Sequence, residues 1–188
     1  MTNLVRAQAL NNLWSNHRLH RACGALDAAA LAAPRRAAFF GSIIATLNHI
    51  LVVDRFYVSG MEGRPLGPVA FRDPVPHPDL AGLRAAQREI DLRLVAMAED
   101  PALTRPDRPV ILPRGDATQV ERFDRLFLHL VQHQIHHRGQ VHALLTEAGV
   151  APPQLDEFHS AWAVDRQRRA PDLAELGLTE GEVWPPDG

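Results

Sequence analysis

The chain has 188 residues, 46% of them hydrophobic, and a formal net charge of −2. This size and apolar content support one core, so we predict a single domain over 1–188, with its core at 3–150 and a C-terminal extension at 151–188. The near-neutral, mixed charge argues against nucleic-acid binding, and no stretch reaches the roughly eighteen apolar residues of a membrane span. The single cysteine and the lack of an apolar leader segment indicate a cytoplasmic protein.

The first half of the chain predicts two long helices and a proline-rich connection. Residues 3–26 place Leu10, Leu13 and Trp14 on one side of a helix, and residues 34–59 contain a second apolar seam. Prolines recur through residues 64–78 and prevent a helix there. We expect this segment to be the long crossover loop of a four-helix bundle, and such loops often cover a site.

The second half predicts two more long helices. The third helix covers residues 79–99, and residues 108–115 form a short strand or an irregular loop. The longest helix is expected to begin at a capping box made by Thr118 and Glu121 and to end at Gly149. A short fifth helix at 154–169 and a tail at 171–188 follow, the tail with enough apolar residues to pack on the bundle or on a partner subunit. The predicted class is therefore all-α.

Histidines are concentrated in the longest predicted helix. His133 and His137 are one turn apart and fall on its apolar seam, whereas His129 and His136 lie at the rim and His142 lies outside it. A buried imidazole costs stability unless its polar atoms are satisfied, and one metal ion can satisfy two of them. The competing pair is His129 and His133, which has the same spacing.

A third ligand should come from another apolar seam, and His49 of the second helix fits. Its seam also contains Phe39, Ser42, Thr46 and Val53, with small residues one turn before the histidine. Three protein ligands with open positions are typical of a catalytic metal centre, whereas structural zinc is usually closed by four ligands, mostly cysteines. We therefore predict a divalent ion, with zinc or nickel named first among several that accept imidazole, since the donor set alone does not choose between them.

Two segments resemble a known family. The run Thr46-Leu-Asn-His49-Ile-Leu-Val-Val-Asp-Arg, followed in the second half by His133-x-x-x-His137-Arg-Gly-Gln140, resembles the DinB family of small helical metalloproteins, which is unrelated to the DNA polymerase of the same name. Segments 12–19 and 152–158 agree, so the similarity covers most of residues 3–160. The resemblance implies a four-helix bundle, His49, His133 and His137 as metal ligands, and often a homodimer.

The resemblance leaves the reaction open. Some relatives are S-transferases or isomerases that use low-molecular-weight thiols. One hypothesis is therefore a metal-dependent enzyme that activates a thiol or water for transfer to, or hydrolysis of, a small molecule. The alternative is a non-catalytic, stress- or damage-associated metal-binding protein in which the ion ties two helices together. An open coordination position distinguishes the two.

Other residues have competing interpretations. Asp54 lies about 140° around its helix from His49, which makes it a poor fourth ligand; it either pairs with Arg138 in the interior or has a solvated or capping role. Gly139 in mid-helix suggests close helix packing beside the site. Cys23 is interpreted as a small apolar residue. Four more side chains are weaker candidates near the site, against ordinary surface or core roles: His17, His20, His159 and Trp162.

Overall fold

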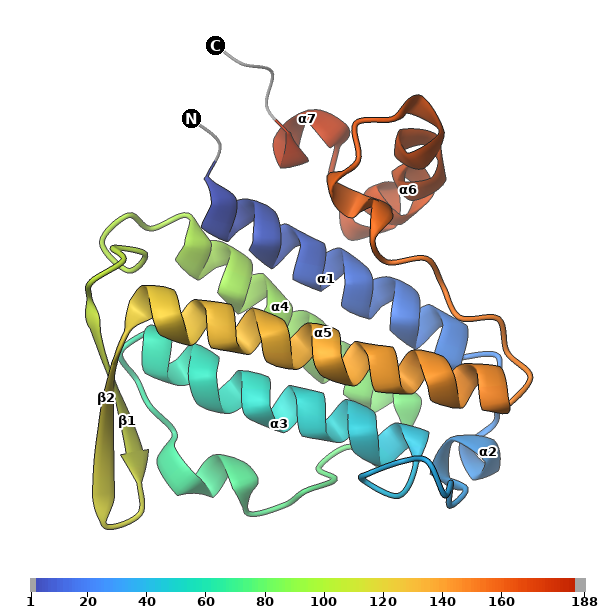
Figure 1. Cartoon of the computed structure of the whole chain (residues 1–188), viewed down its shortest axis with the longest axis horizontal. Coiled ribbons are helices and arrows are strands. Elements are labelled where there is room, and N and C mark those ends of the chain that lie inside the picture. The colour runs from blue at the N-terminus through green and yellow to red at the C-terminus, as the bar shows by residue number, and fades with distance from the viewer. Residues whose placement is uncertain (1–2, 185–188) are drawn as a thin grey trace.

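The computed structural model describes residues 3–184 (Figure 1). Its long helices are α1 (Leu4–Cys23), α3 (Ile43–Met61), α4 (Leu80–Ala98) and α5 (Phe123–Glu147). Shorter elements are α2 (Ala28–Ala32), the 3-10 helices η1 (Gly67–Phe71) and η2 (Glu157–His159), strands β1 (Pro109–Arg114) and β2 (Ala117–Arg122), and helices α6 (Ala163–Leu176) and α7 (Glu180–Val183). The prediction of a mainly helical chain is confirmed, with 63% helix and 7% strand.

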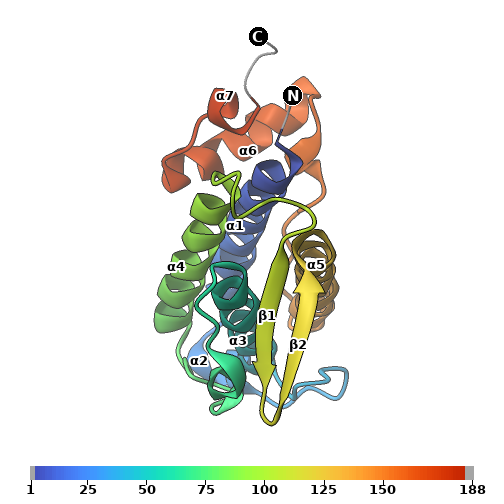
Figure 2. The ribbon, with the colours of Figure 1, turned by 90° about the vertical axis from the view of Figure 1, so that its left-hand side faces the viewer.

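The long helices lie alongside one another. α1 contacts α4 and α5, while α3 contacts α5 and α4 (Figures 1 and 2). Their inward faces form one apolar cluster that includes Leu47, Phe56, Ile90 and Leu130, each at most 2% exposed. Burying a side chain of this size contributes about 1.5–3 kcal/mol, so this cluster is what holds α3 and α5 together along the seam that contains the histidines.

A β-hairpin replaces the predicted start of the longest helix. β1 pairs with β2 in antiparallel register, and Thr118 lies opposite Pro113 in that ladder, so it caps no helix. The strand was one of the two alternatives for residues 108–115. Its buried Val110 and Leu112 alternate with exposed neighbours, as expected for a strand with one covered face. The hairpin packs on α3 at Gly60, where a Cβ atom would collide with the Leu112 side chain.

The second long helix begins nine residues later than the predicted start at residue 34, at Ile43. The Ser42 side chain caps it by accepting a hydrogen bond of 3.2 Å from the Ala45 backbone N–H. The preceding chain is irregular, and Gly41 has a φ of +88°, a conformation that favours glycine. Phe39 therefore lies outside the helix and is 84% exposed, which corrects its placement in the seam.

The proline-rich connection was expected to contain no helix; it has no α-helix in its described residues, but the 3-10 helix η1 occupies Gly67–Phe71, so the expectation of a wholly extended segment is wrong. It runs along α3 on the side away from α5 (Figure 1), so it does not cover the α3–α5 seam. Asn48 holds its end, because the side-chain amide donates to the His77 carbonyl (2.8 Å) and its oxygen accepts from the His77 N–H (2.9 Å).

The C-terminal segment also differs from the prediction. The expected helix at 154–169 is replaced by η2 and by α6, which includes Pro171. The predicted packing of the tail is confirmed, since Leu173 and Leu176 form a second apolar cluster with Trp14 of α1 and Phe158. Residues 185–188 of the predicted tail lie outside the described part of the chain. No described helix is both long and apolar enough to cross a membrane.

Candidate metal centre

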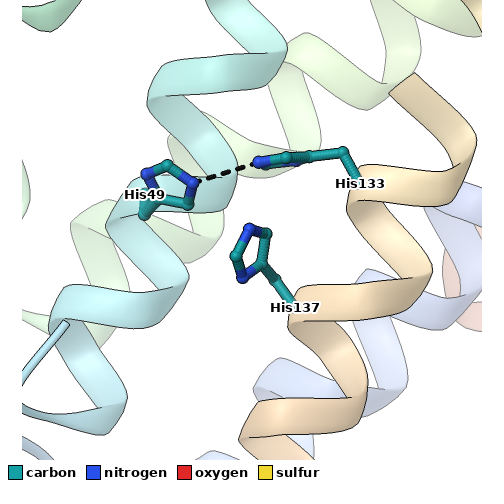
Figure 3. A group of neighbouring side chains, drawn as sticks. All are labelled: His49, His133 and His137. Carbon is teal, nitrogen blue, oxygen red and sulfur yellow. Dashed lines mark hydrogen bonds between the residues drawn. The ribbon is translucent and has the colours of Figure 1, made fainter. Parts of the chain in front are cut away.

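Three imidazoles meet between α3 and α5 (Figure 3). His49 comes from the middle of α3, and His133 and His137 come from successive turns of α5. Each offers one nitrogen within 4.8 Å of the other two. The Nε2 atoms of His49 and His133 are 3.0 Å apart, and the His137 ring centroid lies 4.6 Å from that of His49 and 4.3 Å from that of His133. The residues predicted from the two seams are therefore brought together.

The arrangement fits a divalent ion. Zinc–nitrogen bonds of 2.0–2.1 Å in a tetrahedron place two ligand nitrogens about 3.3 Å apart, close to the His49–His133 separation. His137 Nδ1 lies 2.8 Å from Gln140 Oε1, which can only accept a hydrogen bond. The proton is thus on Nδ1, and the lone pair of Nε2 is free to bind a metal.

The three imidazoles are held in the neutral form. Burial, followed by the charge of His137, lowers the pKa of His49 to about 4. Burial and the neighbouring histidines lower the pKa of His133 to about 3, and burial also lowers the pKa of His137. Neutral imidazole is the form that coordinates metals, so at neutral pH no proton has to be displaced.

An aromatic ring that sequence reasoning missed covers one side of the cluster. Phe40 stacks on His49 with ring centroids 4.0 Å apart and planes inclined by 22°, and its ring lies 5.4 Å from that of His137. It reaches the site from the irregular segment before α3. The Gly41–Ser42 pair, a turn residue followed by an N-cap residue, is the sequence signal that could have ended the helix there and placed Phe40 over the site.

The alternative pair of ligands, His129 and His133, does not come together with a third histidine among the described residues. His129 Nε2 lies 3.2 Å from the Tyr57 hydroxyl oxygen, one turn away from the three-histidine cluster. Arg114 donates to the same hydroxyl at 3.3 Å. His142 lies on another side of α5, where it lines a cavity with Gly139.

A buried polar network lies behind the cluster and joins all four long helices. Arg138 is 4% exposed, and its Nη1 donates to Asn12 and Asn16 of α1 and to Gln134. Asp91 of α4 accepts hydrogen bonds from the same two asparagines at 3.0 and 3.1 Å. Gln134 and Arg138 directly follow His133 and His137 in sequence, so the network fixes the rotation of α5 that presents the imidazoles.

Asp54 belongs to this network, which settles its role. It is 2% exposed and accepts hydrogen bonds from the side-chain amides of Gln87 (2.7 Å) and Gln134. Among the described contacts it forms no direct ion pair with Arg138, because Gln134 lies between them. The prediction that Asp54 is not a ligand agrees with this geometry, and both a solvated and a capping role are wrong.

The network contains two carboxyl groups and one cation. Burial, reinforced by Asp91, raises the pKa of Asp54 to about 8. Burial raises the pKa of Asp91 to about 7 and lowers that of Arg138 to about 10, a shift that both carboxylates oppose. A single guanidinium cannot offset two buried carboxylates, so the protonated form of Asp54 is favoured at neutral pH.

The remaining candidates lie elsewhere. Gly139 is exposed, and a Cβ there would meet nothing within 4 Å, so the expected close packing is wrong. Cys23 is buried, and burial raises its pKa to about 12, in keeping with a small apolar role. The other four candidates do not join the cluster: His17 contacts Glu175, His20 lines a cavity beside α4, His159 contacts Asn11, and Trp162 is 64% exposed.

Comparison with known proteins supports the relationship suggested by the histidine motifs. The sequence matches no curated protein. The model of the DinB family matches residues 1–170, which include all three clustered histidines and the whole buried network. This match covers most of the chain, and the chain therefore belongs to the DinB family.

Proposed function

We propose that this protein is a metal-dependent enzyme that activates a low-molecular-weight thiol or water for transfer to, or hydrolysis of, a small molecule. His49, His133 and His137 would hold a divalent ion, with zinc or nickel favoured. One observation carries the proposal: among the described residues the cluster contains three ligand groups and no fourth. Three ligands leave coordination positions for a substrate. The proposal also includes a four-helix bundle scaffold, a homodimer and a cytoplasmic location.

The side chains around the cluster have definable tasks. When bound, a divalent ion would supply the Lewis acidity that makes a thiol or water nucleophilic near neutral pH. Gln140 orients the His137 ring through Nδ1. Phe40 covers one face of the His49 ring and would limit the access of water there, which would strengthen electrostatic interactions inside the site. The Arg138 network holds α5 in register.

The second candidate is a structural ion that ties α3 to α5. The stacking of Phe40 on His49 favours it, because a ring in that place narrows access to the cluster. The two candidates make the same prediction for metal binding and opposite predictions for ligand exchange.

The ligand set is tested by metal analysis of purified variants. His49→Ala, His133→Ala and His137→Ala should each lose most of the bound metal. His129→Ala and His142→Ala are matched controls on the same helix and should keep it. Full metal content in His49→Ala would remove the three-histidine site, and loss in His129→Ala with retention in His137→Ala would favour the competing pair.

The open position is tested with cobalt-substituted protein. If a position is exchangeable, a small thiol should change the visible spectrum, because thiolate coordination adds a charge-transfer band. The same thiol should then be transferred to an electrophilic test substrate, and His137→Ala should abolish this transfer. A response to azide but not to thiols would favour hydrolysis. A spectrum indifferent to both ligands would favour the structural ion.

A further inference from the structure

A cavity lined by both charged and apolar side chains lies between α1 and α4, the pair of long helices on the other side of the molecule from the α3–α5 seam (Figure 2). Its volume is about 230 Å³. At roughly 30 Å³ per water molecule in the liquid, this is the space of about eight water molecules, enough for a small metabolite. Its walls include apolar Leu13 and Leu176, and its mouth includes Arg84 and Arg88.

The mouth of this cavity is positively charged. Arg84 and Arg88 are one turn apart on α4, both are exposed, and neither forms an ion pair with any acidic group of the described residues. Like charges at this spacing repel each other, so an anion between the guanidinium groups would be stabilising. Arginine also binds carboxylates through two parallel N–H···O bonds. The protein as a whole is slightly acidic, so this local excess of cations is not a general feature of its surface.

An unpartnered polar side chain forms part of the wall. His20 is 4% exposed, lines the cavity, and has no hydrogen-bond partner for its ring nitrogens among the described residues. These nitrogens are not among the fully buried atoms that lack a partner, so they keep some contact with solvent, and the cavity that the ring lines is where a ligand can meet them. Burial, with help from Arg84 and His17, lowers the pKa of His20 to about 3. The neutral ring can therefore donate to, or accept from, a hydroxyl or carboxyl group of a ligand.

The acidic groups around the cavity set the orientation of a ligand. Asp91 lines the floor, but its oxygens already accept from Asn12, Asn16 and Gln87. Glu175, at the α6 side, contacts His17 at 2.9 Å. A ligand carboxylate would be repelled by the floor and attracted to the two arginines, so its charged end belongs at the mouth.

We propose that this cavity binds a small organic acid, with its carboxylate between Arg84 and Arg88 and its carbon body against Leu13 and Leu176. The apolar walls distinguish such an acid from an inorganic oxyanion, which would use the arginines alone. The proposal does not depend on the metal centre or on its function.

Calorimetric titration with butyrate, a monocarboxylate probe of suitable size, tests the proposal. Arg84→Gln combined with Arg88→Gln should weaken butyrate binding by more than about tenfold, the equivalent of about 1.4 kcal/mol. The matched control is Arg36→Gln combined with Arg72→Gln, which removes the same charge from exposed positions elsewhere and should leave binding unchanged. Ala85→Phe fills the cavity while keeping both arginines, and it should also weaken binding.

Three further measurements make the outcome decisive. Because butyrate can also bind metal ions, the titration is repeated with His137→Ala, in which binding should persist; loss there would place the acid at the metal centre and overturn the proposal. Phosphate should bind more weakly than butyrate, and equally tight phosphate binding that ignores Ala85→Phe would mean an oxyanion site instead. In a histidine-labelled NMR spectrum, butyrate should shift the His20 ring signals. No binding of millimolar butyrate, or equal weakening in both double variants, would also overturn the proposal.

Discussion

Replacing Arg138 with methionine removes the one cation of the buried network while keeping a side chain of similar length. The guanidinium group donates to three amide oxygens, on Asn12, Asn16 and Gln134, and offsets the charge of two buried acids. Methionine can do neither. The three oxygens lose a donor, and the two carboxyl groups, where they ionise at high pH, remain in the interior without a counter-charge.

The expected loss of stability is large. Removing one partner of a buried charged group costs about 3–5 kcal/mol, against a total stability of about 5–15 kcal/mol for a domain. The cost should also depend on pH. Asp54 and Asp91 have folded pKa values of about 8 and 7, above the ordinary 3.8, so the folded state holds their protons more tightly than the unfolded state does. Stability therefore falls as pH rises from about 4 towards 8.

The Arg138→Met variant should lose stability more steeply as the pH rises. Arg138 lowers both carboxyl pKa values, so its removal raises them further. Each unit of increase adds about 1.4 kcal/mol to the penalty at high pH and nothing at pH 5, where both carboxyl groups are protonated in either folded protein.

Urea denaturation at pH 5 and pH 9, with a chelator present to remove metal linkage, measures both effects. Arg125→Met is the matched control, because Arg125 lies on the same helix with a side chain that is 71% exposed. It should change stability by less than about 0.5 kcal/mol. The reasoning is refuted if Arg138→Met costs no more than this control, or if its penalty is the same at both pH values.

Three further predictions concern single side chains. Gln140→Leu removes the acceptor that orients His137 and should lower metal affinity about 10–100-fold without changing the number of ions bound, as measured by competition with a chelator; unchanged affinity would contradict this. Asp54→Asn removes a group that must stay protonated, so the decline in unfolding free energy between pH 5 and pH 8 should become shallower, and an equally steep decline would assign it to other groups. Ser42→Ala removes the N-cap of α3 and should cost about 1 kcal/mol in urea denaturation, whereas no loss would show that the cap is dispensable.

The sequence was sufficient for features that repeat along one helix. The seam containing His133 and His137 follows from helical spacing alone, and adding His49 from a second seam predicted the cluster that the fold assembles. The same spacing argument excluded Asp54 as a ligand. In each case the information lies within one or two turns of a single element, where periodicity determines which side chains share a face.

Features that depend on contacts between distant segments were missed. Thr118 and Glu121 match a capping box. That local pattern gives no information on the preceding strand β1, which contains Val110 and Leu112, pairs with this segment and packs on α3. The irregular start of α3 left Phe40 free to fold over His49. Helical spacing also gives no information on a partner such as Gln87, which reaches Asp54 from another helix.

The consecutive residues of the His-Arg-Gly-Gln segment illustrate why the site and the core are inseparable. Successive side chains on α5 are rotated by about 100°, so His137 faces α3, Arg138 faces the buried asparagines of α1, and Gly139 is open to solvent. Gln140 then returns to the His137 ring. Rotating α5 about its axis to improve one of these contacts would break another, because all side chains of a rigid helix turn together. The buried charges are costly for stability, yet they restrict that rotation to one that directs His133 and His137 towards His49, which apolar packing alone would leave less well defined.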